Sequence, residues 1–240
     1  MDLWEANSAA TAYTPHPCNT NQVTACSGTE CGNGDDRYAG LCDKDGCDIN
    51  PYRNGNKAYY GRGSSFGVDT TKPFSIVTQF ITSDNTANGT LVEIRRLYVQ
   101  NGKIIQNAAV DVPGLDATDS LTDDYCAKQK SVFGGNNDFA RQGGLKRMGE
   151  AIQRGMVLAL SIWDDAGGYM GWLDQDPYPA DADPSQPGVG RGPCPTTGGR
   201  PEDLIKQYPD AKVVFSKIRS GEIGSTYGNG TLAIRGATRY

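Results

Sequence analysis

The sequence predicts an all-β fold, a β-sandwich with long loops and a few short helices. Its 240 residues are enough to bury one large core. The 31 glycines and 13 prolines are too many for a helical protein and are typical of short strands joined by turns. Several segments rich in β-branched and aromatic residues end at turn signals, as strands do.

The first half of the chain predicts loops followed by a hairpin. Residues 17–65 are rich in Gly, Asn, Asp and Cys, so we expect long loops there. Residues 74–81 (FSIVTQFI) carry β-branched and aromatic side chains and predict a strand. Residues 91–100 predict the next strand, and the Asn-Gly pair at 101–102 predicts a two-residue turn into a third strand at 103–106.

The one well-defined helix is predicted over residues 144–155. Leu145, Met148 and Ile152 follow one another at three- and four-residue spacing, which places them on one helix face. The apolar run at 156–163 comes next. It predicts a strand buried on both faces, because a half-exposed strand would alternate with polar residues.

The last third predicts a loop, a helical turn and a strand. Residues 174–192 form a Pro-, Gly- and Asp-rich loop of a length that is usually functional. A helical turn is expected near 201–207. Residues 212–219 alternate well and predict a strand with one exposed face. No internal repeat and no domain boundary is evident.

Charge and composition restrict the partners. Lys and Arg number 23 and Asp and Glu 28, so the net charge of −5 leaves no basic excess for binding nucleic acid. No apolar run approaches the roughly 18–20 residues of a membrane span. We therefore expect a soluble protein without nucleic-acid or membrane partners. The single histidine, His16, leaves too little imidazole for a His-rich metal site, and we expect no metal and no cofactor.

The seven cysteines allow two interpretations. A zinc site would favour Cys-x-x-Cys pairs, and the sequence contains none. We prefer a disulfide framework, which implies an oxidising compartment and a secreted protein. Acceptor sequons at Asn88 and Asn229 add weak support for secretion and glycosylation. Because seven is odd, one cysteine must lack a partner within the chain or pair with another chain.

The residues after Met1 lack the basic and apolar regions of a signal peptide. A secreted protein without a signal and with an odd cysteine is expected to be a fragment. We therefore expect the N-terminal part of the protein to be missing from this chain.

Two carboxylates, Asp2 and Glu5, flank Trp4 near the start of the chain. Taken alone, this spacing is more typical of an acidic strand or a helix start than of a catalytic pair. The segment nevertheless resembles the catalytic strand of glycoside hydrolase family seven, the cellobiohydrolases and endoglucanases, whose pattern is E-x-D-x-W-E-A-N. The first Glu of that pattern would stand immediately before Met1, and it is absent from this chain. The matching residues are Asp2, Trp4, Glu5, Ala6 and Asn7.

The likeness continues in order to about residue 226. It includes the segments DRY at 36–38, CDKDGCD at 42–48, NPYR at 50–53, WDD at 163–165, WLD at 172–174, RGPC at 191–194 and IGST at 223–226. The resemblance implies that residues 1–226 are the C-terminal part of one catalytic domain. The implied fold is a concanavalin-like β-sandwich (jelly roll), incomplete in this chain. Residues 227–240 form a tail that the likeness does not cover.

The resemblance implies retaining hydrolysis of β-1,4-glucosidic bonds in cellulose, which uses two carboxyl groups about 5–5.5 Å apart. Glu5 would be the acid/base, Asp2 would orient the nucleophile, and His16 would assist near the leaving sugar. Without the nucleophile Glu before Met1, the chain alone is expected to be inactive. On a regular strand Asp2 and Glu5 would point to opposite faces, so a bulge near residues 3–4 is expected to correct the phase.

The resemblance also assigns substrate contacts and disulfides. Isolated tryptophans are usually core residues and loop charges are usually solvated, but here their matches bind sugars. Trp163 and Trp172 would stack on glucose rings on either side of the scissile bond. The residues implied to hydrogen-bond the leaving-group sugars are Arg37, Asp45, Asp48, Arg53 and Arg191. The implied disulfides are Cys18–Cys42, Cys26–Cys31 and Cys47–Cys126, with Cys194 unpaired here because its partner would lie upstream.

Cellobiohydrolase-like (exo) action is preferred over endoglucanase action. The loops at 178–188 and 123–139 resemble the longer cellobiohydrolase forms, whereas residues 167–170 resemble the endoglucanase form. The expected partners are β-1,4-glucan chains such as cellulose and cello-oligosaccharides, and the full-length protein is expected to be a secreted monomer. One alternative is a non-catalytic, lectin-like β-sandwich that binds carbohydrate. Another is a structural protein stapled by disulfides.

Overall fold

The structure is a computed structural model that describes residues 1–228. Its strands form one four-stranded antiparallel sheet and two smaller pairs. In the sheet the order is β5-β6-β7, and β8 also pairs with β6. The bounds are β1 Asp2–Ala6, β2 Thr11–Thr14, β3 Tyr60–Gly61, β4 Val68–Asp69, β5 Ser75–Thr82, β6 Leu91–Gln100, β7 Lys103–Gln106 and β8 Ser120–Leu121.

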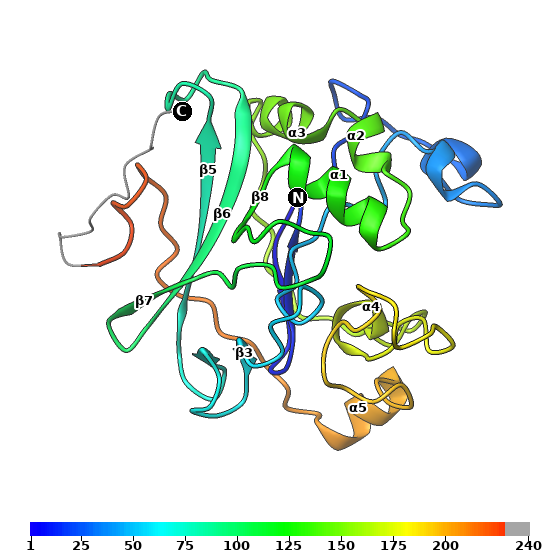
Figure 1. The fold of residues 1–240 in the computed structure, drawn as a ribbon, viewed down its shortest axis with the longest axis vertical. Coiled ribbons are helices and arrows are strands. Elements are labelled where there is room, and N and C mark those ends of the chain that lie inside the picture. The colour runs from blue at the N-terminus through cyan, green and yellow to red at the C-terminus, as the bar shows by residue number, and fades with distance from the viewer. Residues whose placement is uncertain (229–240) are drawn as a thin grey trace.

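Short helices lie at both ends of the β1–β2 hairpin. Figure 1 shows α1, α2 and α3 gathered near the N-terminus and α4 and α5 together at the opposite end. Within residues 1–228, no helix combines the length and the apolar composition that a membrane span requires. The bounds are α1 Asp123–Val132, α2 Asp138–Arg141, α3 Gly144–Gln153, α4 Gly171–Asp174 and α5 Pro201–Gln207, with 3₁₀ turns at Gly28–Cys31 and Arg37–Ala39.

The predicted hairpin is confirmed. The strands expected at 74–81, 91–100 and 103–106 are β5, β6 and β7, in antiparallel register. Asn101 and Gly102 have φ angles of 52° and 73°. Positive φ at both central residues is the geometry that lets a two-residue turn follow the twist of the strands, which is why Asn-Gly predicted it.

The core lies where α1 and α3 pack around the β6 side of the sheet. Leu145 and Met148 of α3 are buried, as the helical spacing predicts, against Leu91 and Ile94 of β6. The expectation of a single well-defined helix is wrong, because α1 also has ten residues. Thr122 caps α1, and acidic residues fill its first turn.

Two expected strands do not form. Residues 156–163 and 212–219 have no strand pairing among the described residues. Both are exposed: Val157 is 94% accessible and Val214 79%. An isolated extended segment cannot satisfy its backbone groups or bury its side chains, because strand structure requires a neighbouring strand and a facing layer. Their apolar patterns therefore mark surfaces that lack a partner in residues 1–228.

Three disulfides staple the loops. The structure pairs Cys18 with Cys42, Cys26 with Cys31 and Cys47 with Cys126, the same pairs that the resemblance implies. Cys194 is unpaired in the part of the chain that the structure describes. Residues 229–240, which hold the sequon at Asn229 and most of the predicted tail, lie outside the described residues.

Candidate active site

A β-bulge in β1 brings Asp2 and Glu5 to one face. Asp2 pairs with Thr14 of β2 and Glu5 with Ala12, so three steps on β1 match two on β2. Residues two apart on a strand share a face, and the extra residue of the bulge restores that phase for Glu5. The expected bulge near residues 3–4 is confirmed.

Asp2 and His16 form an ion pair beside Glu5. His16 Nε2 lies 2.8 Å from Asp2 Oδ2, and its Nδ1 lies 2.8 Å from the Asp43 carbonyl oxygen. Both neighbours are acceptors, so the cationic form of His16, which donates from both ring nitrogens, is the form that this geometry favours. Burial acts against this charge, but the hydrogen bond to Asp2 and the charge of its carboxylate outweigh burial and raise the pKa of His16. Burial likewise opposes ionisation of Asp2, but His16 holds the pKa of Asp2 below its usual value.

Glu5 has the opposite character. Burial, followed by the negative charge of Asp2, raises the pKa of Glu5 to about 7. The charge of Asp48 adds to this shift, and the charge of His16 partly opposes it. Two carboxyl groups on one face thus differ in protonation, one ionised and one able to hold a proton near neutral pH. That difference is the pattern expected of an acid/base pair of residues.

A buried cluster of charge lies near Glu5. Arg53 Nη1 donates a hydrogen bond to Asp48 Oδ1, and Arg53 Nε donates one to the Gly188 carbonyl oxygen over 3.0 Å. Burial opposes ionisation of Asp48, but Arg53 and then Arg191 hold its pKa below the usual range. Burial and the charge of Arg53 lower the pKa of Arg191 to about 10. The buried Nε of Arg191 has no hydrogen-bond partner among the described residues.

A second pair, Arg37 and Asp45, lies at the exposed edge. Arg37 Nε donates to Asp45 Oδ1 over 2.6 Å, and the Tyr38 hydroxyl donates to Asp45 Oδ2 over 2.9 Å. The role of Tyr38 was not predicted. Its place directly after Arg37, in the quoted segment at 36–38, is the signal that could have found it.

The two tryptophans lie together on the α4 side. The rings of Trp163 and Trp172 are stacked on one another with centroids 6.3 Å apart, and Trp163 is 56% exposed. They therefore form one surface, here called the tryptophan platform, and do not lie on either side of a scissile bond as expected. Asn7 Nδ2 donates to Asp174 Oδ2 over 2.6 Å, which joins the end of β1 to α4. The sequence did not predict this link between β1 and the helix that carries Trp172, although Asn7 belongs to the motif that contains Asp2 and Glu5.

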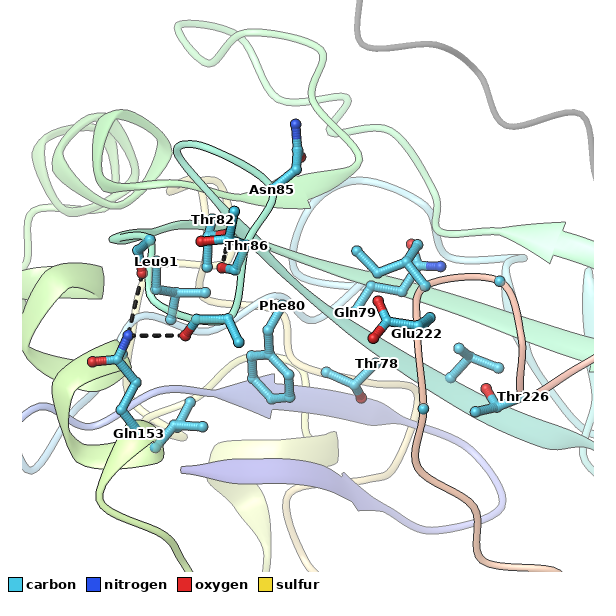
Figure 2. Close-up of a pocket in the computed structure, with 18 of the residues that line it drawn as sticks. Thr78, Gln79, Phe80, Thr82, Asn85, Thr86, Leu91, Gln153, Glu222 and Thr226 are labelled. Carbon is cyan, nitrogen blue, oxygen red and sulfur yellow. Dashed lines mark hydrogen bonds between the residues drawn. The ribbon is translucent and has the colours of Figure 1, made fainter.

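A cavity of about 340 Å³ lies elsewhere, between β5, α3 and residues 221–227. Figure 2 shows Thr78 and Phe80 on its wall, with Gln153 bonded to the 87–89 loop. None of the candidate site residues lines it. In residues 1–228 no cluster of three or more His, Cys, Asp or Glu is placed to hold a metal ion.

The family model described as "Glycosyl hydrolase family 7" matches residues 1–227. A cellobiohydrolase from Daphnia pulex is 52% identical over 85% of this chain and 46% of its own, with a TM-score of 0.83. A cellobiohydrolase from Melanocarpus albomyces complexed with cellotetraose is 40% identical over 95% of this chain and 50% of its own, with a TM-score of 0.85.

An endocellulase from Humicola insolens is similar at 39% identity over 87% of this chain and 46% of its own, with a TM-score of 0.72. The chain therefore spans about half the length of the solved structures it matches. These likenesses confirm the predicted fold class, a β-sandwich with disulfide-stapled loops and short helices.

Proposed function

Because this chain belongs to glycosyl hydrolase family 7, we propose that it forms the acid/base side of an active site that hydrolyses β-1,4-glucosidic bonds in cellulose with retention of configuration. The observation that carries the proposal is the pair made by the bulge, an ionised Asp2 bound to His16 beside a Glu5 that holds its proton to about pH 7. A lectin-like module would have no need of a proton donor. Hydrolysis is therefore favoured over carbohydrate binding alone.

In the proposed mechanism Glu5 acts twice. Glu5 first donates its proton to the glycosidic oxygen as the bond to the anomeric carbon breaks, while a carboxylate nucleophile attacks that carbon from the opposite face. Glu5, now ionised, then removes a proton from water, and that water displaces the nucleophile. Asp2, held by His16, orients the nucleophile. His16 assists at the leaving sugar.

The nucleophile is proposed to be a glutamate joined directly ahead of Met1. The mechanism requires a second carboxylate close to Glu5. Among the described residues Asp2 lies on the same face, but His16 already engages it. The first glutamate of the family motif would fill this role at that position.

Residues 1–226 are proposed to be the C-terminal part of one larger catalytic domain. The apolar segments 156–163 and 212–219 are exposed, and the cavity beside β5 is open between the sheet and residues 221–227. Both features suit a facing layer of strands that residues 1–228 do not supply. The half-length match to the solved structures supports the same division.

The proposed substrates are β-1,4-glucan chains, which bind to the tryptophan platform. On the leaving-group side they bind to two charge clusters, one made of Asp48, Arg53 and Arg191 and the other of Arg37 and Asp45.

Exo action is proposed because the two cellobiohydrolases give TM-scores of 0.83 and 0.85, against 0.72 for the endocellulase. The three disulfides support a secreted enzyme from an oxidising compartment, and the full-length enzyme is proposed to be a monomer. Asn88 is exposed in the 83–90 loop and is a proposed glycosylation site.

A hybrid enzyme tests the proposed function. The part of the Daphnia pulex cellobiohydrolase that precedes its matching region, ending in the motif glutamate, is joined directly ahead of Met1. We expect this hybrid to release mainly cellobiose from swollen cellulose, with the β-anomer formed first, as shown by NMR of the fresh product. Cello-oligosaccharide binding without any sugar release would instead favour the lectin-like alternative.

The hybrid is also expected to lose activity as the pH rises through about 7. Glu5 must be protonated to donate. In this chain burial and Asp2 raise its pKa to about 7, and the hybrid lacks the Met1 ammonium, which lowers that pKa. The measurement is kcat/KM for a cello-oligosaccharide between pH 4 and pH 9. A rate that already falls above about pH 5 would contradict this assignment, because it would place the acid at an ordinary carboxyl pKa.

A further inference from the structure

Arg96 on β6 is a fully buried cation without a carboxylate partner. It is 2% exposed, and its hydrogen bonds go to neutral oxygens. Its Nε and Nη1 have no partner among the described residues. Burying a charge in this way is costly, because no carboxylate of the described residues compensates it. Such a cost calls for a role that an apolar side chain could not fill.

The contacts of Arg96 converge on the bulge of β1. Its Nη2 donates to the backbone carbonyl of Leu3, one of the two residues between the Asp2 and Glu5 pairings. The same nitrogen donates to Thr78 Oγ1 over 2.9 Å, and Thr78 is the residue directly opposite Arg96 on β5. The guanidinium of Arg96 therefore joins Thr78 of β5 to Leu3 in the bulge of β1.

Arg96 also holds the strand that faces the bulge. Its guanidinium lies 4.8 Å over the ring of Tyr13, the single residue of β2 between the Asp2 and Glu5 partners. The Tyr13 hydroxyl is bonded in turn to the Ile94 carbonyl of β6 over 3.4 Å. A cation over an aromatic face is attracted to it, more strongly when both are out of water. Arg96 therefore contacts both strands at the bulge, β1 through Leu3 and β2 through Tyr13.

We infer that Arg96 is a positioning residue that holds the β1 bulge against Tyr13, and so keeps Asp2 and Glu5 on one face. The catalytic importance of this role rests on the proposed function, but the role itself does not. If the bulge relaxes, the strand phase changes and Asp2 leaves His16. The contact between Asp2 and His16 therefore reports the state of the bulge.

The test is the titration of His16 in the 240-residue chain, followed by NMR. It is the only histidine, so its imidazole signals need no separation from others. Asp2 raises the pKa of His16. The other groups that act on the ring are the Asp43 carbonyl, which raises its pKa, the Met1 ammonium, which lowers it, and the carboxyl groups of Asp43 and Glu5. The Arg96→Met variant is expected to shift the midpoint down towards the ordinary value of 6.5, because the Asp2 contact is lost.

The matched control is Arg95→Met, next along β6. Arg95 points to the exposed face and bonds Glu93, so its loss is expected to leave the His16 midpoint unchanged. A folded Arg96→Met variant with the wild-type midpoint would overturn the inference. If that variant does not fold, the His16 midpoint of Arg96→Lys is measured instead. A single ammonium cannot bond Leu3 and also lie flat on Tyr13, so its midpoint is expected to fall too, and an unchanged one would overturn the inference.

The hybrid enzyme supplies a second reading. There Arg96→Met is expected to lower kcat about 100-fold with KM unchanged, since misplacing a catalytic group by about 1 Å has that effect. Its alkaline limit of activity is expected to move to lower pH, because Glu5 loses the neighbouring charge of Asp2. An unaltered pH profile would count against the positioning role. An inactive unmutated hybrid would refute the proposed function alone, because the His16 titration does not depend on hydrolysis.

Discussion

The Glu5→Gln variant of the hybrid enzyme is expected to lose about 10²- to 10⁴-fold in kcat on cello-oligosaccharides, which is the contribution of a positioned proton donor. The amide has nearly the same shape as the protonated acid but cannot give up a proton to the glycosidic oxygen. Binding is expected to remain, because the charge clusters and the tryptophan platform are untouched. The measurement is kcat and KM for cellotetraose at pH 5, where Glu5 is protonated.

A matched substrate and a matched variant sharpen this test. An aryl cellobioside whose phenol departs as a stable anion needs little protonation, so its first step is expected to be far less affected by Glu5→Gln. The control is Glu150→Gln, which changes a half-buried glutamate paired with Arg147 on α3. Equal losses on both substrates would show that Glu5 does not act as the acid.

Replacing Cys47 and Cys126 together by alanine is expected to lower the free energy of unfolding of the 240-residue chain by about 4 kcal/mol. The bond closes a loop with a sequence separation of 79 residues, and long loops lose the most entropy in the unfolded chain when they are cross-linked. Both half-cystines are fully buried in the main core. The measurement is guanidinium unfolding followed by tryptophan fluorescence.

The short disulfide between Cys26 and Cys31 is the control. Its sequence separation is 5 residues, so the same replacement is expected to cost about 2 kcal/mol.

The disulfide between Cys47 and Cys126 also supports the candidate active site. The Asp48 carbonyl, next to Cys47, accepts from Gln129 of α1 over 2.7 Å, so loosening this junction is expected to displace Asp48 and weaken oligosaccharide binding in the hybrid. Equal costs for the two disulfides would contradict the entropic explanation.

Local chemistry made part of this fold predictable. The Asn101-Gly102 turn and the helix carrying Leu145 and Met148 depend on neighbouring residues, so their patterns were sufficient. The bulge followed from the period of a strand and the spacing of Asp2 and Glu5. Helix α1 was missed because its sequence is polar and its burial depends on contacts made far away in the chain, although the cap at Thr122 was readable.

The features that the sequence did not predict depend on contacts between residues far apart in the chain. The apolar runs at 156–163 and 212–219 indicate strands, but a strand forms only beside another strand, which no local pattern can supply. The role inferred for Arg96 was invisible for the same reason, since it lies 93 residues from Leu3 in the sequence. The candidate residues themselves came from motif likeness. Their protonation states required the burial and distances of the folded chain.

The titration of the Glu5 carboxyl in the 240-residue chain tests the central claim most directly. Carbon-13 NMR follows the side-chain carboxyl signal with pH, and the Glu5→Gln variant assigns it by its disappearance. Burial and the neighbouring Asp2 carboxylate predict a pKa of about 7 for Glu5. A value at the ordinary 4.5 would mean that Glu5 is ionised at neutral pH, and it would contradict the account of Glu5 as a carboxyl kept protonated by burial and by Asp2.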